Sequence, residues 1–219
     1  MNKLLSSMFA LAVASVTAIS AQAQEVKGDA KAAEQKIAMC IGCHGIKGYQ
    51  ASFPEVYRVP MISGQNAKYI ASALNAYKKG DRKHPTMRGI AASLSDQDIA
   101  DVAAYYEQHG KTEPVTKVPA APDAKVAALL QKGACVSCHG DNFSKPVDPS
   151  YPKIAGQHKD FLFVALKSYK VENLSTWGRS TGVMGGVAKQ FSNAELKALS
   201  AYVGSLDGDL KTIPQSKFR

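Results

Sequence analysis

The stretch AMCIGCHG at Ala38–Gly45 returns later in the chain as GACVSCHG at Gly133–Gly140. Each copy contains two cysteines separated by two residues, and a histidine directly follows the second cysteine. Together the two copies use all four cysteines of the 219-residue chain. A recurring pattern that includes every cysteine indicates one chemical task carried out twice.

The sequence around the cysteine motifs also repeats. VPMISGQNAKYIASALNAYKKG at Val59–Gly80 matches YPKIAGQHKDFLFVALKSYKVE at Tyr151–Glu172, and the stretches that follow match in the same order. We therefore predict two homologous units, one over residues 24–112 and one over residues 125–219. Residues 113–124 lie between them, contain three prolines, and are predicted to form an exposed linker.

Both units are predicted to be helical. Ser95 with Asp98, and Ser192 with Glu195, resemble the capping boxes that begin helices. Another helix is predicted at Asn66–Lys79. No stretch alternates between apolar and polar residues, as a β-strand would, for more than four or five residues. The predicted fold class is therefore all-α. Apolar residues behind the two capping boxes recur at helical spacing and predict buried stripes: Ile99, Val102 and Tyr106, then Leu196, Leu199 and Val203.

The N-terminal segment Met1–Ala23 resembles a secretory signal peptide. Lys3 precedes an apolar run at Met8–Ala18, and an A-x-A sequence ends the segment. The apolar run is much shorter than the roughly 18 residues that suggest a membrane span. No later segment is apolar enough to span, so we expect an exported, soluble protein.

Positive charge is concentrated in the second unit. The chain has a formal net charge of +9, with 12 Lys/Arg against 10 Asp/Glu in residues 24–116 and 14 against 8 in residues 117–219. A basic surface attracts acidic partners or membrane surfaces. Nucleic acid is not an expected partner, because the protein is predicted to be exported and its basic residues are scattered.

The C-x-x-C-H pattern is the attachment signature of c-type haem. Two thiols bond covalently to the two vinyl groups of the porphyrin, and the adjacent histidine coordinates the iron. The predicted residues are Cys40, Cys43 and His44 in the first unit, and Cys135, Cys138 and His139 in the second.

Three other uses of paired cysteines fit less well. A structural zinc site places its pairs about 15 to 20 residues apart, whereas these pairs lie in separate units. A thioredoxin-like redox pair would require a βαβ setting. Disulfides would be permitted by export, but they do not explain a histidine in the same place twice.

The second axial ligand of each iron decides whether the iron is closed or open to small molecules. Met184 is the only methionine of the second unit and matches Met87 in the repeat. Glycines flank Met184 and predict that it lies in a loop. Met61 and His84 are rivals of Met87, but neither has a counterpart of the same type in the second unit.

Pro60 and Pro152 are predicted to support the histidines. A loop beside the imidazole could offer a backbone carbonyl to its Nδ1–H and so fix the tautomer and the ring orientation. The alternative for both prolines is a simple structural turn.

The chain resembles the dihaem cytochromes c of the cytochrome c4 family. The resemblance rests on the CIGCHG and CVSCHG motifs, the PMISGQ and PKIAGQ turns with their helices, and the SLSDQDIADVAAYY stretch after Met87. It implies two tandem class I cytochrome c domains, related by a pseudo-twofold axis, with haem propionates near their interface. It also implies ligation of one haem by His44 and Met87 and of the other by His139 and Met184.

The resemblance further implies a periplasmic electron carrier with no catalysis of its own. Family members are often loosely held at the inner membrane and pass electrons to terminal oxidases. We therefore predict two covalent haem c groups, a donor such as quinol–cytochrome c reductase, and a terminal oxidase or reductase as acceptor.

Two alternatives remain open at this stage. One is a dihaem enzyme, such as a peroxidase or a thiosulfate-oxidising cytochrome, which would need an open or differently ligated iron. The other is the cytochrome subunit of a flavoprotein sulfide dehydrogenase, which resembles the same two-unit layout.

Overall fold

The computed structural model describes residues 26–110, 120–171 and 176–214. The predicted signal peptide and most of the predicted linker lie outside these residues. The elements of the first unit are α1 (Ala30–Ala33), α2 (Ala38–His44), β1 (Gln50–Ala51), β2 (Tyr57–Arg58), α3 (Ala67–Lys79), β3 (Arg82–Lys83), α4 (Pro85–Ala92) and α5 (Asp96–Gln108).

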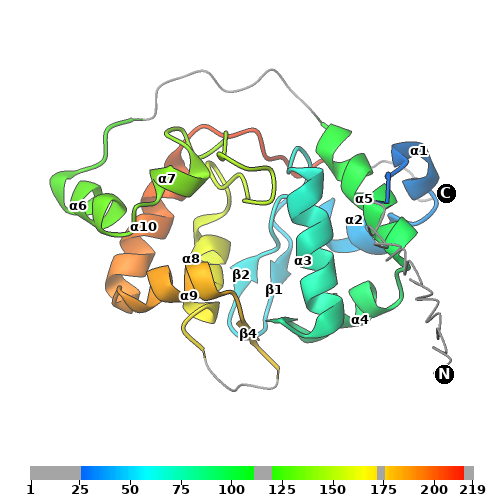
Figure 1. The fold of residues 1–219 in the computed structure, drawn as a ribbon, viewed down its shortest axis with the longest axis horizontal. Coiled ribbons are helices and arrows are strands. Elements are labelled where there is room, and N and C mark those ends of the chain that lie inside the picture. The colour runs from blue at the N-terminus through cyan, green and yellow to red at the C-terminus, as the bar shows by residue number, and fades with distance from the viewer. Residues whose placement is uncertain (1–25, 111–119, 172–175, 215–219) are drawn as a thin grey trace, which may run out of the picture.

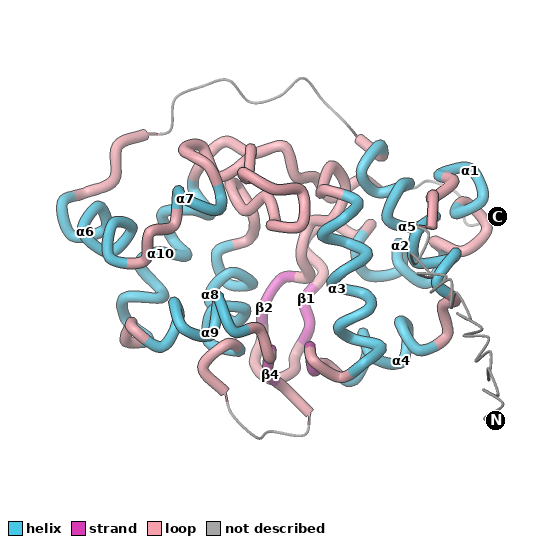
Figure 2. Tube along the Cα trace, viewed as in Figure 1, coloured by secondary structure: helices cyan, strands magenta, loops and turns pink. Residues whose placement is uncertain are grey.

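The second unit repeats this helical order. Its elements are α6 (Ala124–Lys132), α7 (Val136–His139), α8 (Lys159–Ser168), β4 (Gly178–Arg179), α9 (Gly182–Lys189) and α10 (Asn193–Ser205). Figure 1 shows the two units side by side, with α3 and α5 in one and α8 and α10 in the other. Helices and loops make up nearly all of the trace in Figure 2, and each strand has only two residues. The all-α prediction is confirmed.

Both predicted capping boxes are present. The Ser95 hydroxyl accepts from the Asp98 amide at 3.1 Å, and the Asp98 carboxylate accepts from the Ser95 amide at 2.9 Å. Ser192 and Glu195 make the same exchange at 3.2 and 2.7 Å. Each box satisfies amide groups that the first turn of a helix would otherwise leave unpaired, which explains where α5 and α10 begin.

The long helices bury the predicted apolar stripes. In the first unit α5 packs against α1 and α3, and in the second unit α10 packs against α8 and α6. All six stripe residues are buried, with exposed fractions between 1% and 6%. Met87 and Cys40 pack against the core of the first unit, so the predicted haem-binding residues border the apolar interior.

A short antiparallel sheet joins the two units. Strand β3 of the first unit pairs with β4 of the second, and Arg82 lies opposite Arg179. The Ser180 amide extends the contact by donating to Asp81 O at 2.7 Å. On another part of the interface the Lys211 amide donates to Ser63 O at 3.0 Å. The units are therefore held together by backbone pairing at two separate places.

The predicted loop around Met184 is wrong. Residues Gly182–Lys189 form helix α9, and Met184 is its third residue. Glycine disfavours helix by about 1 kcal/mol per residue relative to alanine, which is why the glycines predicted a loop. The helix corresponds to α4 of the first unit, Pro85–Ala92, which has the stronger helical sequence. Tertiary packing of the repeated fold overrides the local preference in α9.

Two turns, one in each unit, require glycine. Gly64 has φ of +85°, and a Cβ there would lie 2.8 Å from Asp209 O. Its counterpart Gly156 has φ of +70°, and a Cβ would lie 2.9 Å from Leu206 O. Both conformations are unfavourable for other residues, and both turns lead directly into a glutamine.

We expect Gly64→Ala to destabilise the protein by at least about 1–2 kcal/mol, because alanine would meet both the left-handed backbone and the Asp209 carbonyl. Gly89→Ala is the matched control: Gly89 is helical and a Cβ there would have nothing within 4 Å, so this change should be neutral or slightly stabilising. Denaturant unfolding followed by circular dichroism measures both. Equal effects of the two substitutions would show that position 64 does not require glycine.

Candidate haem sites

The first cysteine motif lies on helix α2. The last five residues of this helix include Cys40, Cys43 and His44. Both cysteines are partly exposed, and neither forms a disulfide. The helix brings residues three apart to neighbouring positions, as attachment to two vinyl groups of one porphyrin requires. Before haem is attached, burial raises the pKa of the Cys40 thiol to about 11, so this thiol is then protonated at neutral pH.

The second motif is arranged similarly at α7. Cys135 is the N-cap residue of this helix, while Cys138 and His139 lie within it. Both cysteines are again partly exposed free thiols. The described residues contain no group of three or more His, Cys, Asp or Glu side chains that could hold a metal ion.

A backbone carbonyl holds each histidine. His44 Nδ1 lies 2.8 Å from Pro60 O, and His139 Nδ1 lies 3.0 Å from Pro152 O. A carbonyl oxygen only accepts, so Nδ1 carries the proton in both rings and Nε2 keeps a free lone pair. The predicted bonds to the two prolines are therefore present. Each imidazole is the tautomer that can coordinate iron through Nε2.

Burial keeps both histidines neutral. It lowers the pKa of His44 below the usual range, although the bond to Pro60 opposes the shift. Burial lowers the pKa of His139 in the same way, against the bond to Pro152. His139 is only 8% exposed. A neutral imidazole is the form in which histidine binds a metal.

The two methionines occupy equivalent positions. Met87 is the third residue of α4, and Met184 is the third residue of α9. Each helix follows one of the paired strands β3 and β4 that join the units. The structure thus gives the two methionines matched local settings in the two units.

Both ring nitrogens of His84, a rival of Met87, have protein partners. His84 is the N-cap residue of α4, and its Nδ1 accepts from the Met87 amide at 3.4 Å. Its Nε2 lies 3.0 Å from the Tyr57 hydroxyl. Because Nδ1 is the acceptor, Nε2 bears the proton and donates to Tyr57. Neither nitrogen has a lone pair free for iron, and His84 acts as the cap of the helix that carries Met87.

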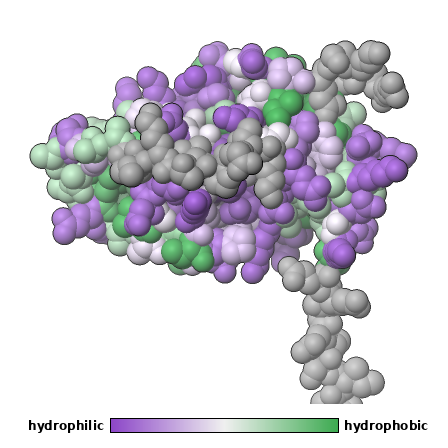
Figure 3. Space-filling view, turned by 90° about the horizontal axis from the view of Figure 1, so that it is seen from above, coloured by the Kyte–Doolittle hydropathy of each residue, from purple (hydrophilic) through white to green (hydrophobic). Residues whose placement is uncertain are grey.

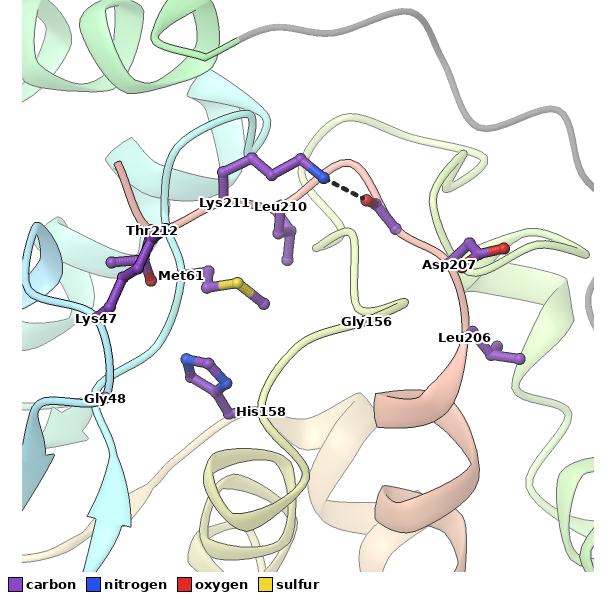
Figure 4. Close-up of a pocket in the computed structure, with 11 residues that line it drawn as sticks. Lys47, Gly48, Met61, Gly156, His158, Leu206, Asp207, Leu210, Lys211 and Thr212 are labelled. Carbon is purple, nitrogen blue, oxygen red and sulfur yellow. Dashed lines mark hydrogen bonds between the residues drawn. The ribbon is translucent and has the colours of Figure 1, made fainter. Parts of the chain in front are cut away.

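Met61, the other rival, lies at a cavity between the units. The cavity has a volume of about 610 Å³, and Figure 4 shows the side chains of Met61 and His158 reaching into it from opposite units. Leu210 and Lys211 also line the cavity, and Lys211 Nζ lies 3.5 Å from Gly208 O. Met61 lies in a loop at this cavity, whereas Met87 and Met184 each occupy the third position of a short helix.

A family model described as Cytochrome c matches the chain twice, at residues 30–109 and 124–207. Cytochrome c4 of Stutzerimonas stutzeri is 32% identical over 193 residues, which cover 82% of this chain and 90% of that protein. The chain belongs to the cytochrome c4 family. A crystal structure of reduced recombinant cytochrome c4 from Pseudomonas stutzeri covers 82% of this chain and 100% of its own, with 28% identity and a TM-score of 0.61.

Another relative of this cytochrome is described as a thiosulfate dehydrogenase electron acceptor. That protein, from Thiomonas intermedia, is 29% identical over 185 residues, which cover 80% of this chain and 81% of its own. The two units are cytochrome c domains, called domain 1 and domain 2 below. The cytochrome carries two covalently attached haem c groups and transfers electrons.

The structure adds two arginines that the sequence analysis missed. Arg82 and Arg179 lie opposite each other across the β3–β4 pair, so two cations from the two domains meet at the interface. Arg82 donates to the Tyr69 hydroxyl at 3.2 Å, and Arg179 donates to the Tyr169 hydroxyl at 3.3 Å. Each arginine precedes its methionine, Met87 or Met184, by five residues. This shared spacing is the feature of the sequence that could have identified the two arginines as counterparts in the repeat.

The arginine pair fits a haem-containing protein. Like charges directly opposite each other in a sheet are destabilising. Among the described residues no carboxylate forms an ion pair with either arginine, and the buried Arg82 Nε has no hydrogen-bond partner there. Haem carries two propionate carboxylates, which these cations could bind. The donor set of this cytochrome therefore suits two haem groups whose acidic edges face the interface.

The surface has few apolar areas where Figure 3 shows it. On that face hydrophobic residues form small separate patches among hydrophilic ones. Over the part of the chain that the structure describes, none of the helices is both long and apolar enough to cross a bilayer.

His84 gives a prediction about pH. Burial lowers the pKa of His84 in the folded protein. Below the ordinary histidine pKa of about 6.5, His84 is therefore protonated in the unfolded chain but still neutral in the folded protein. Stability that depends on neutral His84 is therefore lost as the pH falls from 7 to 5. His84→Asn keeps a good N-cap without a titrating group, so unfolding by denaturant at the two pH values should show a smaller loss. An unchanged loss would exclude this role.

Proposed function

We propose that the haem of domain 1 is ligated by His44 and Met87, and that of domain 2 by His139 and Met184. The observation that carries the proposal is the matched pair of settings. In each domain a carbonyl-bound histidine leaves Nε2 free, and a methionine occupies the third position of a short helix after a paired strand. The engaged nitrogens of His84 support Met87 in domain 1.

A histidine and a methionine would together hold the haem iron, and the group would then supply one-electron chemistry without taking up small ligands. The residues of this chain hold and orient the group. The prolines fix the histidine tautomer, burial keeps the rings neutral, and the two arginines provide charge for the propionates. We therefore propose a single-electron carrier that has no catalytic activity of its own.

The carrier is proposed to work in the periplasm. The signal-peptide-like Met1–Ala23 supports export, although it lies outside the described residues. We propose that the protein takes electrons from quinol–cytochrome c reductase or another respiratory donor and passes them to a terminal oxidase or reductase. The excess of basic residues in domain 2 favours acidic partner surfaces or loose membrane association.

A second candidate donor is an enzyme that oxidises thiosulfate. The relative from Thiomonas intermedia, described as a thiosulfate dehydrogenase electron acceptor, favours it. Stopped-flow mixing of the oxidised cytochrome with a thiosulfate dehydrogenase and thiosulfate separates the candidates from each other. Rapid reduction there, but slow reduction by quinol–cytochrome c reductase, would replace the respiratory donor with this one.

We expect Met184→Ala to open the iron of domain 2. Carbon monoxide should then bind one of the two reduced haems, and the potential of that haem should fall, because the thioether ligand favours the reduced iron. Visible spectra with carbon monoxide and a redox titration measure the two effects.

Met61→Ala serves as the methionine control and should leave both haems closed to carbon monoxide, as in the unmodified protein. Carbon monoxide binding to a haem of the unmodified protein would overturn the closed-carrier proposal. It would direct attention to the alternatives, a peroxidase or a sulfur-compound oxidase. An unchanged titration of Met184→Ala would refute the assignment of Met184.

A further inference from the structure

Two buried glutamines bridge the domains reciprocally. Gln157 of domain 2 bonds both backbone groups of Met61 in domain 1: its Oε1 accepts from the Met61 amide at 3.0 Å, and its Nε2 donates to Met61 O at 2.8 Å. Gln65 of domain 1 makes the same pair of bonds with Lys153 of domain 2, both at 2.9 Å. The four bonds follow the pseudo-twofold relation of the domains, because Gln65 and Gln157 are repeat counterparts.

Each glutamine touches the peptide group that holds the other domain's histidine. The Met61 amide that Gln157 accepts from belongs to the same peptide unit as Pro60 O, the acceptor of His44 Nδ1–H. The Lys153 amide that Gln65 accepts from shares a peptide unit with Pro152 O, the acceptor of His139 Nδ1–H. A single peptide group therefore separates each glutamine oxygen from the imidazole of the opposite domain.

Such a chain of bonds is cooperative. Accepting the amide proton polarises the peptide group and places more negative charge on its carbonyl oxygen, which makes this oxygen a stronger acceptor. A stronger acceptor draws the Nδ1 proton of the histidine and makes Nε2 a more basic ligand. A more basic axial ligand stabilises the oxidised iron and lowers the reduction potential.

Both glutamine side chains are buried. Gln65 is 5% exposed and Gln157 is 4% exposed. In a medium of low dielectric constant hydrogen bonds polarise one another more strongly than in water. The glycine turns at Gly64 and Gly156 bring the chain back sharply and aim the glutamines across the interface. The Met61 side chain lies at the neighbouring cavity (Figure 4), while the Met61 amide and carbonyl are both bonded to Gln157.

We propose that Gln65 and Gln157 are positioning residues that each tune the haem of the opposite domain. Gln157 lowers the reduction potential of the haem held by His44, and Gln65 lowers that of the haem held by His139. The proposal rests on the proposed histidine–methionine ligation. It predicts a crossed effect: a substitution in one domain changes the haem in the other.

The test is a spectroelectrochemical titration of the haem-loaded full chain with Gln157→Leu or Gln65→Leu. Leucine has a similar size but cannot accept the amide proton. Gln157→Leu should shift the reduction equilibrium of the domain 1 haem by up to about tenfold toward the reduced state, equivalent to about 59 mV for one electron. Gln65→Leu should shift the domain 2 haem in the same direction. In each variant the haem of the mutated domain should move much less.

Met87→Ala and Met184→Ala assign the two potentials, since each displaces one of them. If neither displaces a potential, the proposed ligation fails. If both do and the glutamine variants shift nothing, only the present proposal fails. Equal shifts of both haems in both variants would also overturn it, because general loosening of the interface would act on both domains.

Asn66→Leu is the matched control. Asn66 is another interface amide, next to Gln65 in sequence, and its Nδ2 donates to Tyr151 O at 3.2 Å. That carbonyl belongs to a different peptide group from the one that holds His139, so both potentials should stay unchanged. If a leucine variant does not load haem, Gln157→Asn or Gln65→Asn replaces it; the amide is one methylene shorter and should give a smaller shift of the same sign.

A second readout follows the bond itself. In the reduced protein the Nδ1 proton of the opposite histidine is observable by nuclear magnetic resonance. It should move upfield in each leucine variant, because its acceptor is weaker. A potential that shifts without any change of this resonance would contradict the route through the prolines.

Discussion

The hydrogen bond from a histidine Nδ1–H to a proline carbonyl is the interaction on which the rest of each domain depends. It selects the tautomer, orients the ring, and requires a loop to run beside the cysteine motif. That loop continues into a glycine turn and then into a glutamine that crosses to the other domain. The geometry of iron ligation and the geometry of domain association therefore share one short segment of chain.

Much of this architecture could be predicted because its signals are local. Two cysteines and a histidine within five residues are enough to predict haem attachment. A serine three residues before an acidic residue predicts where α5 and α10 begin. Repetition strengthened every such signal. The recurrence of Pro60 and Pro152 at matching positions made a carbonyl bond to each histidine one of two interpretations, beside a simple turn, and the structure contains the bonds.

The features that escaped prediction depend on contacts between distant residues. Met184 lies in a helix although glycines surround it, because the repeated fold, and not local propensity, decides that segment. Arg82 and Arg179 meet only because β3 and β4 pair across the domains. The glutamines were visible as a repeated Gly-Gln pair, but nothing in the sequence showed that each would bond to the loop of the opposite domain.

The bond between the Lys211 amide and Ser63 O joins segments that are far apart in the chain. Asp209 O also lies against Gly64, at the turn that precedes Gln65. During synthesis the first domain emerges well before residues 209–211 do. The turn that presents Gln65 therefore acquires its final packing only when the second domain has been synthesised and has folded. Maturation of the two haem-binding domains is consequently a coupled event, in which the domain made first is completed by the one made second.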